Sequence, residues 1–312
     1  MNKTLKRILI IFIAGFTILN LVAMMHAYKF SNFTQEGSKT LGASKLSVIQ
    51  KIKTLVMGVD NPKSKSLKFP TAEFETLFVL SDNQKIEIWK VPVQNKKGWV
   101  VLFHGYSASK SSLLAEAKAF NDLGYSTYLV DFLGAGGSEG FNTTIGFKEA
   151  KQVRDVVMEL QKGEASKPYL FGVSMGAVAI LKSVSEYSLN VKGLILECPF
   201  GSMLQTVKAR FKMMGVPSFP MAHLLTFWGG ALNGFNGFGH NPVGYASRVS
   251  VPILHMLGDQ DSKVSLLESK EIFEAFLGAK KFVLFEELGH ESYVTHDSLA
   301  WVAEMNAFLV AP

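Results

Sequence analysis

From residue 73 onward, the hydrophobic positions alternate between short apolar runs typical of buried strands and longer amphipathic stretches typical of helices. The expected strands are 74–80, 85–93, 99–103, 126–130, 169–173, 193–196, 252–257 and 281–285, and the expected helices include 111–123 and 145–161. Strands that alternate with helices predict a parallel sheet covered on both faces. The first two strands, joined around Ser81-Asp82-Asn83, predict an antiparallel hairpin at its edge.

The N-terminal pattern is different. Residues 8–25 form an uncharged, mostly apolar stretch that follows Lys3, Lys6 and Arg7. As a helix these eighteen residues would rise about 27 Å, nearly the thickness of a hydrocarbon core. We interpret the stretch as an uncleaved membrane anchor, because residues 22–28 match poorly the small-residue pattern of a cleavage site. A cleaved signal peptide and a buried helix are the alternatives.

The flanking charges predict an orientation and a division into domains. Basic residues before the apolar stretch favour a cytoplasmic N-terminus and a translocated body, periplasmic if the chain is bacterial. Lys29 and Lys39 on the other flank weaken this asymmetry. We expect an anchor or signal segment at 1–28, a polar basic linker at 29–72 and the main domain at 73–312. The linker, helical-looking over 41–57, either lies on the membrane surface or is solvated.

The excess positive charge is confined to one end of the chain. Residues 1–70 carry 11 Lys and Arg against 2 Asp and Glu, a net charge of +9, whereas the remainder has a net charge of −3. A nucleic-acid-binding protein needs a basic face on its folded domain, so the sequence argues against that class. Cys198 is the single cysteine, which excludes an internal disulfide.

The segment Gly172-Val173-Ser174-Met175-Gly176 joins an expected strand to an expected helix. A serine hydroxyl is a weak nucleophile in water, so an enzyme holds it exposed, beside a base and near donors for an oxyanion. A sharp strand-to-helix turn does this, and its crowded backbone favours glycine on both sides of the serine. We predict Ser174 as a catalytic nucleophile; the alternative is a turn whose serine caps the helix.

The partners of such a serine belong on loops after later strands. His290, in Leu288-Gly289-His290-Glu291 after the last expected strand, is the predicted base. Asp261, in the loop after residues 252–257, is the predicted acid that orients the imidazole. Asp259 in the same loop and Glu197 at the end of the preceding strand remain alternatives.

The loop after the strand 99–103 supplies the remaining predicted group. Gly105 permits a turn that aims the next amide toward an oxyanion, so we assign the backbone N–H groups of Tyr106 and Met175 as the oxyanion hole. His104 is interpreted as a structural residue of that loop. No cofactor and no metal ion are expected, since this chemistry requires neither.

The order Ser174, Asp261, His290, with His104-Gly105 early in the chain, resembles the α/β-hydrolase family over residues 73–310. Within it the chain resembles membrane-anchored serine hydrolases of the Bem46 type and serine aminopeptidase S33-like enzymes. The resemblance implies an α/β-hydrolase fold: a mostly parallel central sheet, helices on both faces and a helical lid insertion. Relatives carry arginine in an Asp-x-Arg-Gly loop where this chain has Leu133, which removes one polar tether of that loop.

The segment between the strands 193–196 and 252–257 bears on the substrate. Residues 200–248 are rich in Phe, Met, Leu and Gly, which favours a lid with an apolar acyl or aromatic pocket, although plain helix packing is the alternative. The expected function is therefore a serine hydrolase, carboxylesterase or lipase-like, acting on a small-molecule ester through an acyl-enzyme. A peptidase or amidase, a thioesterase, an acyltransferase and a silent membrane-tethered binding protein are the other hypotheses.

Overall fold

The computed structural model describes residues 2–42 and 45–310 of the chain, which folds into two compact units. Unit 2 consists of Lys63–Ser202 and Asn241–Pro312. Unit 1 combines Met1–Pro62 with Met203–His240, so it is built from two segments far apart in the sequence. The division means that the insertion between two strands of unit 2 folds together with the N-terminal segment.

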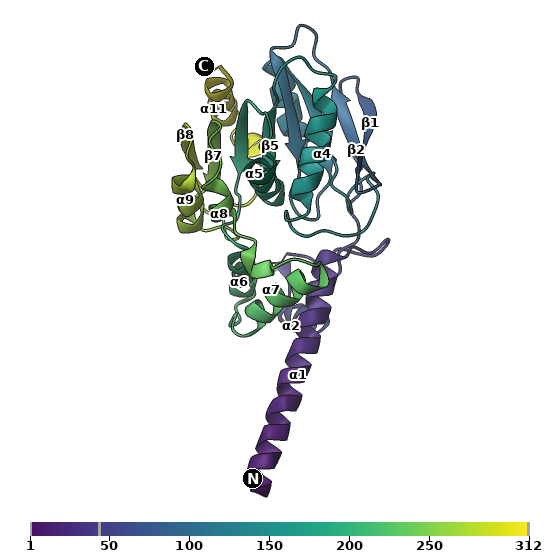
Figure 1. Ribbon diagram of the computed structural model, residues 1–312, viewed down its shortest axis with the longest axis vertical. Helices are drawn as coiled ribbons and strands as arrows, with labels where there is room; N and C mark the ends of the chain where they lie inside the picture. Colours follow the sequence, from purple (N-terminus) through teal and green to yellow (C-terminus); the bar gives the residue numbers. More distant parts are fainter. Residues whose placement is uncertain (1, 43–44, 311–312) are drawn as a thin grey trace. The chain divides into compact units, whose positions relative to one another are not determined.

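Unit 2 contains an eight-stranded sheet in the order β1-β2-β4-β3-β5-β6-β7-β8 (Figure 1). The strands are β1 (Glu75–Ser81), β2 (Gln84–Val91), β3 (Gly98–Phe103), β4 (Tyr125–Val130), β5 (Tyr169–Val173), β6 (Gly193–Glu197), β7 (Ile253–Gly258) and β8 (Lys280–Phe285). The β1–β2 and β2–β4 pairs are antiparallel, and all other neighbours are parallel. The predicted sheet, with its antiparallel hairpin at one edge, is confirmed.

Helices cover both faces of this sheet. Those on one face are α4 (Glu149–Gln161), α5 (Met175–Tyr187), α8 (Pro242–Ala246) and α9 (Leu266–Ala275). Those on the other are α3 (Leu114–Asp122), which follows the 3-10 helix η2 (Lys110–Leu113), α10 (Tyr293–His296) and α11 (Ser298–Val310). Because both faces are covered, every residue of β4, β6 and β7 is buried, which explains their uninterrupted apolar runs.

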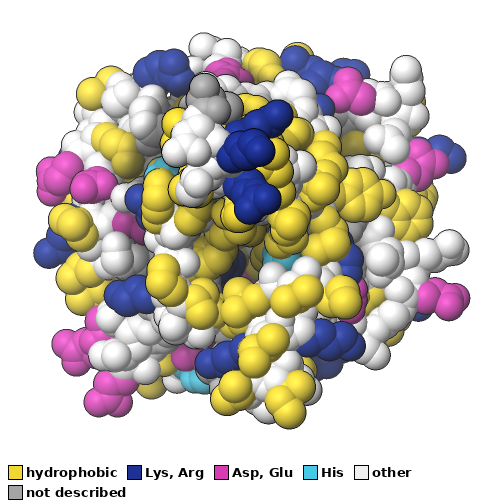
Figure 2. All heavy atoms as spheres, turned by 90° about the horizontal axis from the view of Figure 1, so that it is seen from below, with side chains coloured by type: hydrophobic (Ala, Val, Ile, Leu, Met, Phe, Trp, Pro, Cys, Tyr) yellow, Lys and Arg dark blue, Asp and Glu magenta, His cyan; other side chains and the backbone are white. Residues whose placement is uncertain are grey.

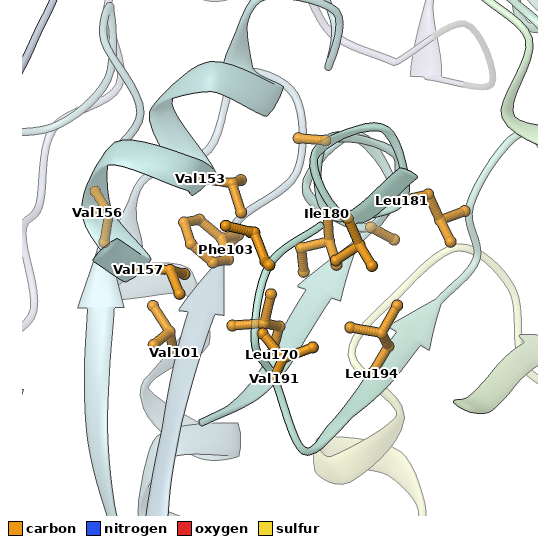
Figure 3. Close-up of a cluster of buried hydrophobic side chains, with 14 of the residues drawn as sticks. Val101, Phe103, Val153, Val156, Val157, Leu170, Ile180, Leu181, Val191 and Leu194 are labelled. Atoms are coloured by element: carbon orange, nitrogen blue, oxygen red, sulfur yellow. The ribbon is translucent and has the colours of Figure 1, made fainter. Parts of the chain in front are cut away.

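The larger hydrophobic cluster fills the space between the sheet and helices α4 and α5 (Figure 3). Phe103, Leu170 and Leu194 of three neighbouring strands point toward Val157 of α4 and Ile180 of α5, and all five side chains are fully buried. Truncating such a side chain to alanine typically costs about 2–5 kcal/mol. This packing fixes the spacing of the strands and thereby the loops at their carboxyl ends.

Unit 1 is helical. Its helices are α1 (Lys3–Ser31), α2 (Val48–Met57), α6 (Met203–Met214), α7 (Met221–Leu232) and the 3-10 helix η3 (Gly237–Gly239). The helix α7 packs along α1, while α6 and η3 pack on α7. Trp228 Nε1 of α7 donates a hydrogen bond to Asn20 Oδ1 of α1 at 3.1 Å. The N-terminal helix is therefore tied to the insertion by a specific polar contact as well as by packing.

Two helix starts differ from the sequence prediction. The helix expected at 41–57 begins at Val48, because Ser47 and Gln50 form a reciprocal capping box that fixes its N-terminus. The helix expected at 145–161 begins at Glu149, because Ile145 and Gly146 have φ angles of 56° and 99°. Local hydrogen bonds and left-handed backbone, which the hydrophobic pattern does not report, decide both boundaries.

Among the described residues, α1 is the helix long and apolar enough to cross a membrane. A signal peptide meets the same criterion of length and composition. Every residue from 2 to 19 is exposed, whereas Ala23, His26 and Ala27 further along the helix are buried. The apolar stretch therefore has an exposed first part, up to residue 19, and a later part that the other segments of unit 1 cover.

Candidate active site

Ser174 lies at a strained turn between β5 and α5. Its φ and ψ angles are 52° and −109°, a conformation that non-glycine residues rarely adopt. A Cβ atom at Gly172 would lie 2.7 Å from Ala177 N, and one at Gly176 would lie 2.3 Å from Phe103 O. The backbone leaves no room for side chains at these two positions, which is the crowding inferred from the glycine spacing.

The structure brings His290 and Asp261 together. His290 Nδ1 lies 2.7 Å from Asp261 Oδ2, and the carboxylate is buried while the imidazole remains partly exposed. Asp261 Oδ1 accepts hydrogen bonds from the backbone N–H groups of Lys263 and Val264. Burial raises the pKa of Asp261, but the hydrogen bond from His290 and those from the backbone outweigh it, and the pKa lies below its ordinary value. The carboxylate is therefore held in its charged form beside the imidazole.

The two loops that carry these residues approach each other closely. A Cβ atom at Gly258, the last residue of β7, would lie 2.3 Å from Leu288 O. The N–H of Gly258 donates to the hydroxyl of the buried Tyr293 at 2.9 Å. Because Gly258 has no side chain, the loop that carries Asp261 can lie in contact with the loop that carries His290.

The second ring nitrogen of His290 faces the end of β6. Its Nε2 lies 4.0 Å from the sulfur of Cys198, a buried residue that directly follows β6. Glu197, the last residue of β6, pairs with Val173, the residue before Ser174, and the N–H of Ser174 donates to Glu197 O at 2.8 Å. The imidazole thus lies at the carboxyl ends of the two strands on which Ser174 is positioned, where α/β sheets bind their ligands.

The predicted oxyanion donors lie on both sides of the serine turn. Met175 is the first residue of α5, so its N–H belongs to the unsatisfied amide groups at a helix N-terminus, where negative charge is stabilised. A Cβ atom at Gly105 would lie 3.7 Å from Ser174 Cβ, so the loop that carries Tyr106 passes directly beside the serine. Both predicted donors therefore come from backbone next to Ser174.

His104 is buried and bonded on both ring nitrogens. Its Nδ1 donates to Gly105 O at 2.8 Å, and its Nε2 accepts from the N–H of Phe132 at 3.1 Å. Burial lowers the pKa of this imidazole, so it is held neutral. His104 connects the oxyanion loop to the loop that follows β4.

The loop after β4 is tethered by lysines that the sequence analysis did not identify. The fully buried Lys110 bonds through Nζ to Asp131 and, at 2.6 Å, to Glu87 Oε1, and its backbone N–H donates to Asp131. Lys63 Nζ bonds to the carbonyl oxygens of Ser138 and Gly140. The expected loss of a tether at Leu133 is therefore offset by cations from elsewhere. No spacing in the sequence distinguishes Lys110 from the other lysines.

Two further carboxyl groups are buried behind the site. Glu197 accepts a hydrogen bond from Trp301 Nε1 at 2.8 Å. Glu116 accepts one at 2.6 Å from the hydroxyl of Ser292, which lies two residues after His290. Burial raises the pKa of both groups, and Glu116 raises that of Glu197 further. Glu197 is bonded to Trp301, whereas Asp261 has the contact with His290. Asp259, the other alternative acid, is exposed.

One group of described residues brings metal-ligand atoms together: Cys198, Asp261 and His290, whose atoms lie within 4.8 Å of one another. Asp261 and His290 already bond to each other. Burial, and then the nearby carboxylates of Asp261 and Glu197, raise the pKa of the Cys198 thiol well above its ordinary value. Since a metal ion binds the thiolate, the raised pKa of Cys198 disfavours a metal ion at this group.

Comparison with known proteins gives one family and several structures. Residues 94–226 match the family model of the serine aminopeptidases, S33. An uncharacterised Bacillus subtilis protein, YqkD, is 23% identical over 242 residues, which are 75% of this chain and 79% of that protein. The matched family segment includes Ser174 and ends before Asp261 and His290.

Solved structures share the fold at low sequence identity. The Pyrococcus furiosus esterase Pf2001 aligns with a TM-score of 0.66 and 18% identity, covering 80% of this chain and 98% of that one. Est1E from Butyrivibrio proteoclasticus, solved with ferulic acid bound, aligns with a TM-score of 0.60 and 17% identity, covering 76% and 100%. The resemblance to the α/β hydrolases and the predicted α/β-hydrolase fold are confirmed.

Proposed function

Because the chain has the α/β-hydrolase fold and its residues 94–226 match the family model of the serine aminopeptidases S33, we propose that it is a serine hydrolase that cleaves a carboxylic ester through an acyl-enzyme. The observation that carries the proposal is the 2.7 Å contact between His290 Nδ1 and the buried Asp261 carboxylate, at the strand ends that also hold Ser174. A carboxylate in this position fixes the tautomer of the imidazole and stabilises its protonated form. In this proposal His290 Nε2 is the nitrogen that accepts the proton.

In this mechanism Ser174 Oγ attacks the ester carbonyl carbon and gives its proton to His290 Nε2. The N–H groups of Tyr106 and Met175 stabilise the oxyanion of the tetrahedral intermediate. When the ester C–O bond breaks, His290 returns the proton to the departing alkoxide and an acyl-Ser174 remains. Water, deprotonated by His290, attacks this acyl group in turn and releases the carboxylic acid and free Ser174.

The composition of the insertion supports an uncharged acyl group. Residues 200–248 contain no Asp or Glu, and Phe219, Phe227 and Phe238 are exposed. The name of the matched family favours one alternative, an aminopeptidase. We propose an ester because the esterases Pf2001 and Est1E share the fold of this chain, and an apolar acyl or aromatic part because the insertion is rich in Phe, Met and Leu.

The proposal includes attachment to a membrane through α1, with the catalytic unit on the extracytoplasmic side. The packing of α7 against α1 supports a retained anchor over a cleaved signal peptide. Cleavage after α1 would remove the helix against which α7 packs and leave Trp228 without its hydrogen bond to Asn20. Lys3, Lys6 and Arg7 support a cytoplasmic N-terminus.

A matched substrate panel tests the reaction class. The purified full-length protein in detergent is given an ester, a thioester and an amide that share one acyl group, in a series of acyl lengths, beside Ser174→Ala. We expect the highest kcat/KM for the ester, and no turnover in the variant. A higher kcat/KM for the amide would replace the esterase by an amidase. If Ser174→Ala kept the parent's turnover, the proposed mechanism would be wrong.

A further inference from the structure

We propose that unit 1 as a whole lies on an anionic lipid bilayer, with α2 and the insertion helices α6, α7 and η3 around the point where α1 enters the membrane. We call these four helices, α2, α6, α7 and η3, the collar. This goes beyond an N-terminal anchor, because it assigns a lipid contact to the insertion between β6 and β7. The proposal concerns a surface and does not depend on the reaction that Ser174 performs.

The length of bare helix gives the first argument. From Ile8 to Leu19, α1 is apolar apart from Thr17 and exposed on all sides. These residues rise only about 18 Å, whereas a hydrocarbon core is about 30 Å thick. The next apolar turns of α1, with Ala23 and Ala27 buried, are covered by unit 1 rather than bare. A bilayer matched to the whole apolar stretch therefore reaches the collar.

The exposed side chains of the collar give the second argument. In α2, Ile49, Ile52 and Val56 recur at helical spacing and are 80%, 58% and 54% exposed. No residue of α2 is fully buried, so the side of the helix that carries Ile49, Ile52 and Val56 remains exposed. In the insertion, Phe227 and Phe238 are 51% and 47% exposed. Amphipathic helices with such unburied apolar faces lie in the interfacial layer of membranes.

Charge identifies the bilayer as the occupant. Unit 1 carries 11 Lys and Arg against 2 Asp and Glu, and its insertion segment has three basic residues and no acidic one. Figure 2 shows hydrophobic side chains with Lys and Arg beside them in the middle of the view from below. Basic residues beside apolar ones match anionic headgroups above acyl chains. A protein partner would not require continuity with a helix of membrane-spanning length.

The C-terminal end of α2 is attached to the covered part of α1. Lys29 Nζ pairs with Asp60 at 3.1 Å, and a Cβ atom at Gly58, which ends α2, would lie 3.0 Å from the Lys29 side chain. On the insertion side, the Trp228–Asn20 hydrogen bond lies one turn before the buried Ala23. Both parts of the collar are thus attached to the same covered portion of α1.

Lipid-borne quenchers test the collar directly. Single cysteines at Ile49→Cys and Phe227→Cys are labelled with a bimane in the full-length protein, reconstituted in vesicles of phosphatidylcholine and phosphatidylglycerol. Native Cys198 is 1% exposed and stays unlabelled. Ile11→Cys reports the span, and Leu299→Cys, at an 87% exposed apolar position of α11, is the matched control.

With nitroxide lipids labelled near the headgroup, we expect both collar labels to be quenched about twofold or more beyond the Leu299→Cys label. The Ile11→Cys label should be quenched by nitroxides deep in the acyl chain. Collar labels that match Leu299→Cys, while Ile11→Cys is quenched, would overturn the proposal and leave a simple anchor. Loss of quenching at all positions would overturn it as well, because α1 would not span the bilayer. None of these readings requires turnover, so they remain separate from the test of the esterase.

Discussion

The two units of the chain differ in their net charge and in how far they bury charged and apolar side chains. Unit 2 has 21 Lys and Arg against 24 Asp and Glu, and it buries ionic groups such as Lys110, Asp131 and Glu197 in hydrogen-bonded networks. Unit 1 has a net charge of +9 and leaves its lysines and many apolar side chains exposed. This difference supports the proposal that unit 1 contacts lipid, since unit 2 has no such excess of positive charge.

This contrast separates what mutations should do. In unit 2, buried polar contacts hold the loops of the candidate site, so that removing one partner leaves another uncompensated in the interior. In unit 1, contacts join helices that are individually half exposed, so that single changes cost little. The predictions below test this division from the largest expected effect to the smallest.

The largest effect concerns the acid of the triad. Asp261→Asn should lower kcat about 10⁴-fold, because an amide facing His290 Nδ1 favours the wrong imidazole tautomer. Asp259→Asn, two residues earlier in the same loop, is the control and should change kcat only a few-fold. Steady-state kinetics on the best ester of the panel measures both. If Asp259→Asn were the more damaging change, the assignment of Asp261 would have to be exchanged for Asp259.

A smaller effect is expected at the buried lysine. Lys110→Met should lower the free energy of unfolding by about 3–5 kcal/mol, because Asp131 and Glu87 would lose their shared cation. The control is Lys151→Met, whose pair with Asp82 is largely exposed and should contribute about 0–1 kcal/mol. Urea denaturation of the full chain gives both values. Equal costs would mean that the loop after β4 does not depend on Lys110.

The buried carboxyl groups predict a pH dependence of stability. Burial raises the pKa of Glu197 and of Glu116, so the folded protein binds protons that the unfolded chain has released. This contribution is complete below the unfolded pKa and is lost as the pH rises through the folded pKa. The melting temperature should therefore fall as the pH rises above the ordinary pKa of a glutamate, and fall less in Glu197→Gln, which can still accept from Trp301. An unchanged slope in the variant would count against this role of Glu197.

The smallest effect is expected in unit 1. Trp228→Phe keeps an aromatic ring on α7 but removes its hydrogen bond to Asn20, a loss of about 1 kcal/mol. Amide hydrogen exchange in α7 should become about fivefold faster, while exchange in α4 of unit 2 provides an internal control. Phe227→Leu, at an exposed neighbouring position, should leave the exchange of α7 unchanged. Unchanged exchange in Trp228→Phe would show that α7 is held without this contact.

The fold was predictable because its features are local in the sequence. Buried strands are recognisable in the sequence as apolar runs, and the range 169–173 expected for β5 agrees with the structure at both ends. The positions of Gly172 and Gly176 follow from crowding within one turn, so the turn around Ser174 could be predicted as well. The chain order of Ser174, Asp261 and His290 follows from the loops at the strand ends.

What the sequence could not provide are contacts between distant segments. The pairing of Lys110 with Asp131 and Glu87 joins three parts of the chain, and no spacing rule connects them. The packing of α7 on α1 joins residues about 200 positions apart, as the Trp228–Asn20 bond illustrates. Hydrophobic patterning marks both helices as apolar but does not say what covers them, so it leaves both a lid and plain helix packing open for the insertion.

Activity-based labelling tests the central claim that His290 activates Ser174. The full-length protein in detergent is exposed to a fluorophosphonate, beside Ser174→Ala and His290→Ala variants whose folding is checked by circular dichroism. The account predicts covalent labelling of the parent at the peptide that contains Ser174, and none in either variant. A folded parent that resists the probe, or a Ser174→Ala variant that is still labelled, would contradict it.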